Sequence, residues 1–263
     1  MTPRALAEEN ARDAVRHFAR HAPGAVLTEE KGVLAVLSAT PAGGTFHAAV
    51  LRTDPTTAPA SVIAAARRLA TDHARDVTIW AAEDLDRDLR DECVAEMLAA
   101  RTPHAGMSLA APPEGLIPPP GIRVRRVATP EGIHDFAEIH RQNYRSAGLS
   151  PDCADHVATP GSLLDPAVDA FVAEVDGVPA ACAMALVTGS VGGIYWVGTR
   201  PEFRRRGLGD LLSRTATRAA FGRGARLVVL QATASGESVY RRLGFTRFTT
   251  YLHYTASPVT AGS

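Results

Sequence analysis

The chain of 263 residues has few cysteines and no excess of either charge, and each scarcity excludes a class of protein. Its cysteines, Cys93, Cys153 and Cys182, are widely spaced and form no Cys-x-x-Cys pair, which argues against a disulfide framework or a structural zinc site. We expect small buried thiols in a reducing compartment. Because 28 basic residues balance 28 acidic ones, we expect no general basic face for nucleic acid.

Long hydrophobic runs are also missing. No stretch approaches the ~18 apolar residues of a membrane span, and no apolar leader segment follows the first residues, so we expect a soluble cytoplasmic protein without a membrane partner. Hydrophobic residues nevertheless make up 46% of the chain. The length suffices for one large domain or two smaller ones, each with its own core.

Residues 111–121 divide the chain, because they contain five prolines and two glycines. Such a segment forms neither a helix nor a central strand. It predicts a semi-rigid linker over 112–121. We therefore expect an N-terminal α/β domain at 1–111, a C-terminal domain at 122–255 and a flexible tail at 256–263.

The hydrophobic pattern predicts mixed α/β structure in both parts. In the N-terminal part we expect helices over 3–21, 58–73 and 85–99 and strands over 25–29, 33–38, 46–51, 77–81 and 106–110. In the C-terminal part we expect a helix capped by Thr129 and reaching residue 144. Asp176-Gly177 predicts a hairpin. The remaining expected elements there are strands over 122–127, 170–175, 178–187, 192–199, 227–231 and 245–254, with helices over 208–221 and 235–242.

The segment 197–210 carries the strongest chemical signal. A strand ends, a turn rich in arginine follows, and a helix begins with Gly207 and Gly209 at its first turn. The first turn of a helix has unpaired N–H groups and the positive end of the helix dipole. Glycines let a phosphate approach those groups. The segment therefore predicts a phosphate or diphosphate site. It is no Walker loop, and the third glycine of a dinucleotide fingerprint is replaced by Leu212.

Two motifs in this part of the chain resemble those of the GNAT acetyltransferase family. Arg204-x-x-Gly207-x-Gly209 is similar to the family's Gln/Arg-x-x-Gly-x-Gly/Ala, and Tyr240 with Gly244-Phe245 is similar to its Tyr-x-x-x-Gly-Phe. The resemblance covers about 122–254. It implies an α/β fold with a mixed sheet, a GNAT fold in the C-terminal half, and a smaller GNAT-like domain before it. The N-terminal half has no Arg-x-x-Gly-x-Gly turn, so we expect no cofactor there.

The resemblance also implies roles for the matched residues. Acetyl-CoA would be the co-substrate, with no metal. Tyr240 would be the general acid that protonates the leaving thiolate. Backbone groups at the strand end would bind the acetyl and pantetheine portion, and those of the turn would hold the pyrophosphate. The expected cofactor-binding residues are Val197, Gly198, Thr199, Arg204, Arg205, Arg206, Gly207, Leu208, Gly209, Asp210 and Thr233.

Two positions depart from the family pattern. Thr233 stands where many members have asparagine, and Val228 stands where some carry a glutamate base. The general base is therefore unassigned, and a neutral amine or a water chain would need none. The candidates are Glu174, Glu237, His140, Tyr144 and His253. Ile194-Tyr195-Trp196 either lines the acceptor pocket or packs in the sheet.

The resemblance leaves the acceptor open. We expect acetylation of a primary amine on a small molecule, by direct attack in a ternary complex. The alternatives are a protein lysine or N-terminal amine, and an acyl-CoA-binding regulatory protein without turnover. Nucleic-acid binding through the arginines would appear as strong salt dependence. Acceptor specificity would lie in residues 144–164 and the last strands. The sequence does not reveal the oligomeric state, and a homodimer is possible.

Overall fold

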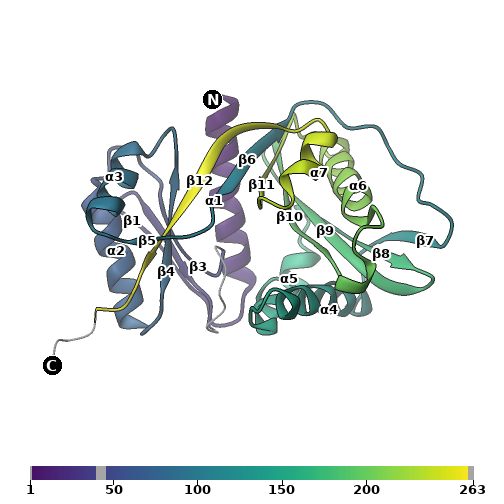
Figure 1. Ribbon diagram of the computed structural model, residues 1–263, viewed down its shortest axis with the longest axis horizontal. Coiled ribbons are helices and arrows are strands. Elements are labelled where there is room, and N and C mark those ends of the chain that lie inside the picture. The colour runs from purple at the N-terminus through teal and green to yellow at the C-terminus, as the bar shows by residue number, and fades with distance from the viewer. Residues whose placement is uncertain (1, 40–45, 260–263) are drawn as a thin grey trace.

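The computed structural model describes residues 2–39 and 46–259. Within these ranges, twelve strands form one mixed sheet, and helices pack on both of its faces (Figure 1). The three cysteines are free and buried, as predicted. Among the described helices, none has the length and apolar character needed to cross a membrane.

The N-terminal half follows the predicted order of elements, with one further short strand, β5, that was not predicted. Its bounds are α1 (Pro3–His21), β1 (Val26–Glu30), β2 (Val33–Leu37), β3 (Ala48–Arg52), α2 (Pro59–Asp72), β4 (Val77–Ala82), α3 (Arg87–Ala95), β5 (Ala99–Ala100) and β6 (His104–Leu109). The helix expected over 85–99 ends early, because Met97 has a positive φ of 54°. The N–H of Leu98 closes the helix on the carbonyl of Cys93 at 3.0 Å.

The C-terminal half also contains the predicted elements. Its bounds are β7 (Ile122–Arg126), α4 (Pro130–Ser146), η1 (Pro151–His156), α5 (Pro160–Leu163), β8 (Val168–Val175), β9 (Val178–Thr188), β10 (Val191–Thr199), η2 (Pro201–Phe203), α6 (Leu208–Gly222), β11 (Leu227–Ala232), α7 (Glu237–Arg242) and β12 (Thr246–Ala256). Of the predicted tail, residues 260–263 lie outside the described residues.

Two short helices in residues 151–163 were not expected. Each begins at a proline, and the side chain before that proline caps it: Ser150 accepts from the N–H of Asp152, and Thr159 from that of Ser162. A capping residue followed by proline is the sequence signal that identifies both starts.

The two halves exchange their last strands. The strand order is β1-β2-β3-β4-β12-β6-β11-β10-β9-β8-β7. Strand β6 precedes the proline-rich linker but pairs with β11, and β12 at the C-terminal end crosses to pair with β4 (Figure 1). The sheet is therefore continuous through both halves. The division into domains at 1–111 and 122–255 stays a prediction from the sequence.

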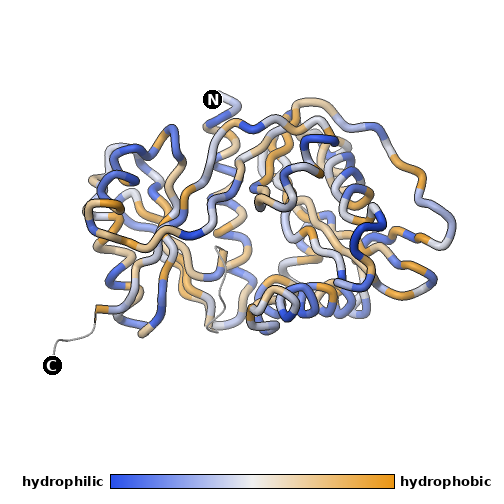
Figure 2. The backbone as a smooth tube through the Cα atoms, viewed as in Figure 1, coloured by the Kyte–Doolittle hydropathy of each residue, from blue (hydrophilic) through white to orange (hydrophobic). Residues whose placement is uncertain are grey.

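Helices cover the sheet with one apolar face each. On α6 the buried residues Leu208, Leu212, Ala216 and Ala220 recur at helical spacing and join the core beneath β8 to β11. The opposite face of the sheet is covered by α1 and α4. Figure 2 shows the result: helices alternate between hydrophilic and hydrophobic residues along their length.

Candidate active site

Strand β10 leaves its neighbour β11 in the middle of the sheet. The two strands pair in parallel only over residues 191–193 and 227–229, although β10 continues to Thr199. On its other edge the register with β9 shifts between Tyr195 and Gly198, and Trp196 has a positive φ of 53°. A positive φ is rare in a residue other than glycine, and a bulge with such a backbone conformation is typical of functional sites. Among the described residues, no strand pairs with the β11-facing edge of residues 194–199.

The turn before α6 presents a row of free N–H groups. Within the described part of the chain, no hydrogen bond uses the backbone N–H of residues 205–210. Gly207 has a φ of 76°, which favours glycine, and Arg205 has a φ of 65°. A Cβ added at Gly207 or Gly209 would meet no atom within 4 Å, so the space in front of the N–H groups is open. The positive end of the α6 dipole points into it.

Arg204 and Arg206 of this turn make different contacts within the protein. The guanidinium of Arg204 donates to Thr199 O at 3.3 Å and to Asn143 Oδ1 at 3.0 Å, so it braces the end of β10 against α4. Arg206 lies over the ring of Phe203, with 5.4 Å to the centroid. The side chain of Arg204 is thus engaged within the protein, and its backbone is what the turn offers to a ligand.

Tyr240 lies on α7, the helix that follows β11. It is half-buried, packs on the core beneath α6, and makes an edge contact with Phe245 at 5.9 Å between ring centroids. Burial raises the pKa of Tyr240 to about 12, opposed by the Ser213 hydroxyl. The phenol is therefore protonated at neutral pH, as a proton donor must be.

Thr233 closes the turn between β11 and α7. Its hydroxyl accepts the N–H of Gly236 at 3.3 Å and lies 3.2 Å from Ser235 Oγ. The hydroxyl is exposed, so Thr233 shapes the approach to Tyr240 and keeps an accessible oxygen. Glu237, in the first turn of α7, pairs with Arg241 at 2.7 Å.

The candidate bases His140 and Tyr144 of α4 are buried, and His140 is held by a hydrogen bond within the protein. His140 Nε2 lies 2.9 Å from the carbonyl oxygen of Trp196, so this nitrogen carries the proton and supports the β10 bulge. Burial lowers the pKa of His140 to about 4 and raises that of its neighbour Tyr144. His140 is therefore neutral at physiological pH, and its role here is to hold the backbone.

Glu174 and His253 each have partners on other strands. Glu174 pairs with Arg125 at 2.6 Å on the outer strands β7 and β8. His253 stands opposite Trp80 of β4, in the N-terminal part of the sheet, and burial lowers its pKa to about 3. The structure places Tyr240 on the core beneath α6, the helix that begins at the glycine turn, and it places Glu174 and His253 on other strands in contacts of their own.

The N-terminal helix α1 docks on β10, which the sequence did not predict. Asn10 donates to Thr188 Oγ1 at 2.9 Å, and its Oδ1 accepts the hydroxyl of Tyr195 at 2.8 Å. A Cβ at Gly193 would lie 2.1 Å from Asn10 Oδ1, so only glycine fits there. A glycine inside a strand signals such a close approach, and Gly193 is the residue that could have revealed it.

A small hollow of about 10 Å³ lies beside this junction, where β10 and β11 part, and it has room for about one water molecule. Its wall includes Ala7 and Ala11 of α1, Tyr195 of β10, Gln231 of β11, and Phe248 and Tyr251 of β12. Both the first helix and the exchanged last strand therefore enclose it. Of the segment Ile194-Tyr195-Trp196, which was expected to line an acceptor pocket or pack in the sheet, only Tyr195 borders this hollow.

A second group of polar residues links the halves elsewhere. His17 and His21 of α1 and Asp165 offer ligand atoms that all lie within 4.8 Å of one another. His21 Nε2 lies 3.5 Å from Asp165 Oδ2, and His17 Nε2 lies 3.2 Å from the carbonyl oxygen of Ser162. These contacts tie α1 to the segment around α5, outside the site described above.

Comparisons with known proteins agree with this geometry. Residues 133–245 match the sequence model of the acetyltransferase (GNAT) family. No curated protein matches the chain. A GCN5-related N-acetyltransferase from Kribbella flavida is similar in fold, with a TM-score of 0.71 and 20% identity over 97% of this chain and 96% of that one.

Two further solved structures share the two-part fold. A tandem GNAT protein from the clavulanic acid biosynthesis pathway has a TM-score of 0.63 and 16% identity, covering 91% of this chain and 86% of that chain. A GCN5-related N-acetyltransferase from Sphaerobacter thermophilus has a TM-score of 0.60 and 17% identity, covering 95% and 87%. Residues 133–245 are thus similar in sequence to the GNAT acetyltransferases, a family of acyltransferases that use acetyl-CoA, and the solved structures show that both halves together share the fold of GNAT proteins.

Proposed function

We propose that the protein transfers the acetyl group of acetyl-CoA to a primary amine of a small molecule, by direct attack in a ternary complex. The observation that carries this proposal is the row of free N–H groups at 205–210, which fits a diphosphate at the positive end of α6. Arg205 and Arg206 add positive charge beside it. The acetyl-CoA supplies an activated acyl group, and the chain's own residues supply position and protons.

The free edge of β10 positions the reacting end. Backbone groups of Val197, Gly198 and Thr199 line the gap between β10 and β11 and are available to the pantetheine and the thioester carbonyl. An N–H aimed at that oxygen stabilises the charge that develops on it. Thr233 borders the same gap from β11 and offers its hydroxyl to the cofactor.

Tyr240 protonates the sulfur as the carbon–sulfur bond breaks. Its raised pKa keeps the phenol protonated until a thiolate forms nearby. Because the tyrosine packs against Phe245 and the core beneath α6, its ring is held in one orientation.

The cover that α1 forms over β10 favours a small acceptor over a protein one. Helix α1 packs on the face of β10 through Asn10, Ala7 and Ala11, and a hollow of only about 10 Å³ remains beside it. A lysine on a folded protein or an N-terminal peptide would need an open groove at this place. Acetylation of a protein amine is the alternative, and a peptide substrate in the assay below tests it.

The test combines calorimetry with an amine panel. We expect the purified protein to bind CoA, and to release free thiol from acetyl-CoA with at least one small primary amine. Tyr240→Phe removes the proton donor and leaves the N–H row intact, so we expect turnover to fall about 100-fold with an unchanged CoA dissociation constant. CoA binding without thiol release from any amine, or full activity of Tyr240→Phe, contradicts the proposal.

A further inference from the structure

The end of α1 presents two imidazoles to the C-terminal half of the chain. His17 and His21 are four residues apart, so both rings lie on one face of the helix. Their ring centroids are 4.8 Å apart. The helix contacts α5, and Figure 1 shows the end of α1 beside that short helix. Two histidines at this spacing on one helix are an arrangement that can hold a zinc ion.

Asp165, which follows α5, completes a group of three potential ligands. One ligand atom from each of His17, His21 and Asp165 lies within 4.8 Å of the other two. Asp165 Oδ1 accepts the N–H of Ala167 at 2.7 Å, and Oδ2 lies 3.5 Å from His21 Nε2. Within residues 2–39 and 46–259, no arginine or lysine pairs with this carboxylate. Apart from a protonated His21, the described part of the chain therefore supplies it with no cation.

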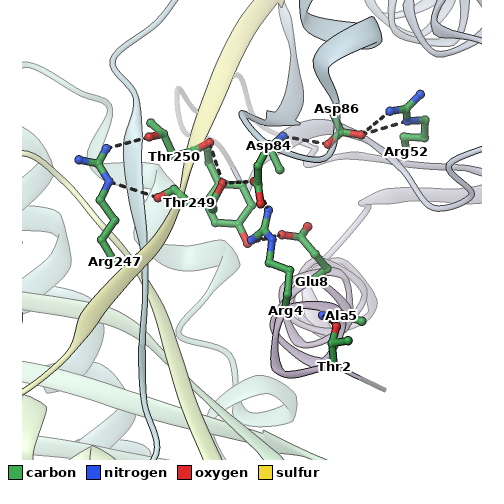
Figure 3. A network of polar contacts seen from close by, with 12 residues as sticks. Thr2, Arg4, Ala5, Glu8, Arg52, Asp84, Asp86, Arg247, Thr249 and Thr250 are labelled. Atoms are coloured by element: carbon green, nitrogen blue, oxygen red, sulfur yellow. Dashed lines mark hydrogen bonds and ion pairs between the residues drawn. The ribbon is translucent and has the colours of Figure 1, made fainter.

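The other end of α1 differs in this respect. Arg4 lies 2.8 Å from Glu8 and 2.8 Å from Asp84, as Figure 3 shows. The start of α1 is thus fastened to the segment after β4 by a cation of the chain itself. At the end of α1, the contact with a distant segment includes a carboxylate but no guanidinium. A bound metal ion would supply the positive charge there.

The contacts around the histidines hold the rings and leave a nitrogen for a ligand bond. Ser162 places its carbonyl oxygen 3.2 Å and its hydroxyl 3.3 Å from His17 Nε2, so this nitrogen can donate or accept. The ring can therefore carry its proton on either nitrogen, and the other keeps a lone pair. A Cβ at Gly161 would lie 2.6 Å from His21 Nδ1, so the backbone of α5 lies directly against that ring. Outer contacts of this kind orient metal ligands.

The group is accessible from solvent on one side. His17 is buried, whereas the side chains of His21 and Asp165 are 29% and 27% exposed. Zinc bonds to imidazole nitrogen and carboxylate oxygen are about 2.0–2.2 Å long, which places tetrahedral ligand atoms ~3.4 Å apart. Rotation of the two partly exposed side chains brings the three atoms to that separation without moving the backbone of α1.

We propose that His17, His21 and Asp165 bind one Zn²⁺ ion, which fastens the end of α1 to the segment around α5. Two neutral imidazoles and one carboxylate form the ligand set, and water takes the fourth position. Imidazole ligands favour zinc over magnesium and calcium, which prefer oxygen. The Thr159 hydroxyl donates to the carbonyl oxygen of His21 at 3.1 Å, so the ion strengthens an existing junction between the halves. The inference does not depend on the proposed acetyl transfer.

Titration of the chelator-treated protein with zinc chloride tests the site by calorimetry. We expect one Zn²⁺ per chain and, at 100 times the dissociation constant, a rise of the thermal midpoint by about 5–10 °C. EDTA should reverse the rise. Co²⁺ in place of zinc should give the visible absorption of a nitrogen-bound cobalt ion. A wild-type protein that takes up no zinc, or whose thermal midpoint zinc does not raise, overturns the proposal.

Two variants each remove one ligand. Asp165→Asn keeps an oxygen for the N–H of Ala167, so the fold should persist while the charge is lost, and His21→Ala removes an imidazole. We expect either variant to weaken zinc binding at least about 100-fold and to abolish the rise of the thermal midpoint. His134→Ala is the matched control, because His134 is exposed on α4 outside this group. Zinc binding of wild-type strength in both ligand variants overturns the proposal.

Hydrogen exchange shows whether the ion holds α1 in place. We expect zinc to slow the exchange of backbone amides in the last turn of α1 and around α5, and to leave α2 unchanged. A simple ion pair between His21 and Asp165, with no metal, predicts that zinc affects neither segment. That result overturns the proposal and leaves the proposed function standing.

Discussion

The two halves carry turns at equivalent places, and the turns differ in what they offer an anion. Each turn follows a strand that pairs in parallel with the next one: β10 with β11, and β3 with β4. Before α6, the N–H groups of residues 205–210 are free. Before α2, Asp54 Oδ1 accepts the N–H of Thr56 at 2.8 Å and its hydroxyl at 2.7 Å. A carboxylate of the chain itself therefore binds an N–H group in the N-terminal turn, whereas the N–H groups of the other turn have no such partner.

The gap between the strands differs as well. At the end of β3, the buried Arg52 lies 2.6 Å from Asp86 and 2.8 Å from Asp88, so an ion pair occupies the ends of β3 and β4. At the end of β10 the corresponding edge has no strand partner among the described residues. The comparison teaches that one fold supports an anion site or a structural ion pair, depending on a few loop residues.

The largest effect is expected when an acidic residue, as found in the N-terminal turn, is introduced into the C-terminal turn. Gly209→Asp would set a carboxylate beside the free N–H groups, as Asp54 does in the N-terminal turn. We expect repulsion of the diphosphate to weaken CoA binding by about 100-fold, or about 3 kcal/mol. Calorimetry measures it. Gly222→Asp, at the other end of α6 and also with open space around its Cβ, is the control and should bind normally.

A smaller effect is expected from the ion pair in the N-terminal half. Arg52→Met leaves Asp86 and Asp88 without their partner and should lower the free energy of unfolding by about 2 kcal/mol, less than for a fully buried pair because Asp88 is 55% exposed. CoA affinity should not change. Chemical denaturation and calorimetry on the same variant check both statements, and a loss of CoA binding would contradict the separation of the two sites.

The loss of stability in Arg52→Met should also depend on pH. The hydrogen bond from Arg52 lowers the pKa of Asp88 below its ordinary value of 3.8. A lowered carboxyl pKa stabilises the fold above the unfolded pKa, and this contribution is lost as the pH falls through the folded one. The difference in stability between wild type and Arg52→Met should therefore narrow below about pH 3.8. A constant difference would show that packing of the arginine stem dominates.

The smallest effect is expected at the N-terminal turn itself. Asp54 is exposed, and its removal in Asp54→Ala frees the N–H of Thr56 without disturbing the Arg52 ion pair. In the Gly209→Asp background, where the C-terminal turn is closed, we expect Asp54→Ala to restore no heat with CoA. A returning signal would reveal a latent anion site in the N-terminal half.

Local signals in the sequence located most of the elements and the glycine turn. The helix α1 has the predicted bounds, and Asp176 and Gly177 have the positive φ values of 50° and 81° that a tight hairpin requires. These features depend on residues within a few positions of one another. The short helices in 151–163 begin with a cap and a proline, but at six and four residues they are too short for hydrophobic periodicity to indicate them.

The partners of these elements could not be predicted from the sequence. The Tyr251 hydroxyl meets Glu8 across 243 positions, and Tyr195 meets Asn10 across 185. No periodicity in either segment signals the other. The same holds for β6 and β12, whose alternation predicts strands but not that each pairs with the other half.

The amino-acid sequence alone determined where most helices and strands form and predicted one helix start suited to a phosphate, because caps, glycines and hydrophobic spacing act over a few residues. Only the tertiary structure decided that the last strands are exchanged, that α1 covers β10, and that the hydroxyl of Tyr251 donates to Glu8. Those contacts come from burying the apolar faces of distant segments together, and the polar side chains meet as a consequence of that packing.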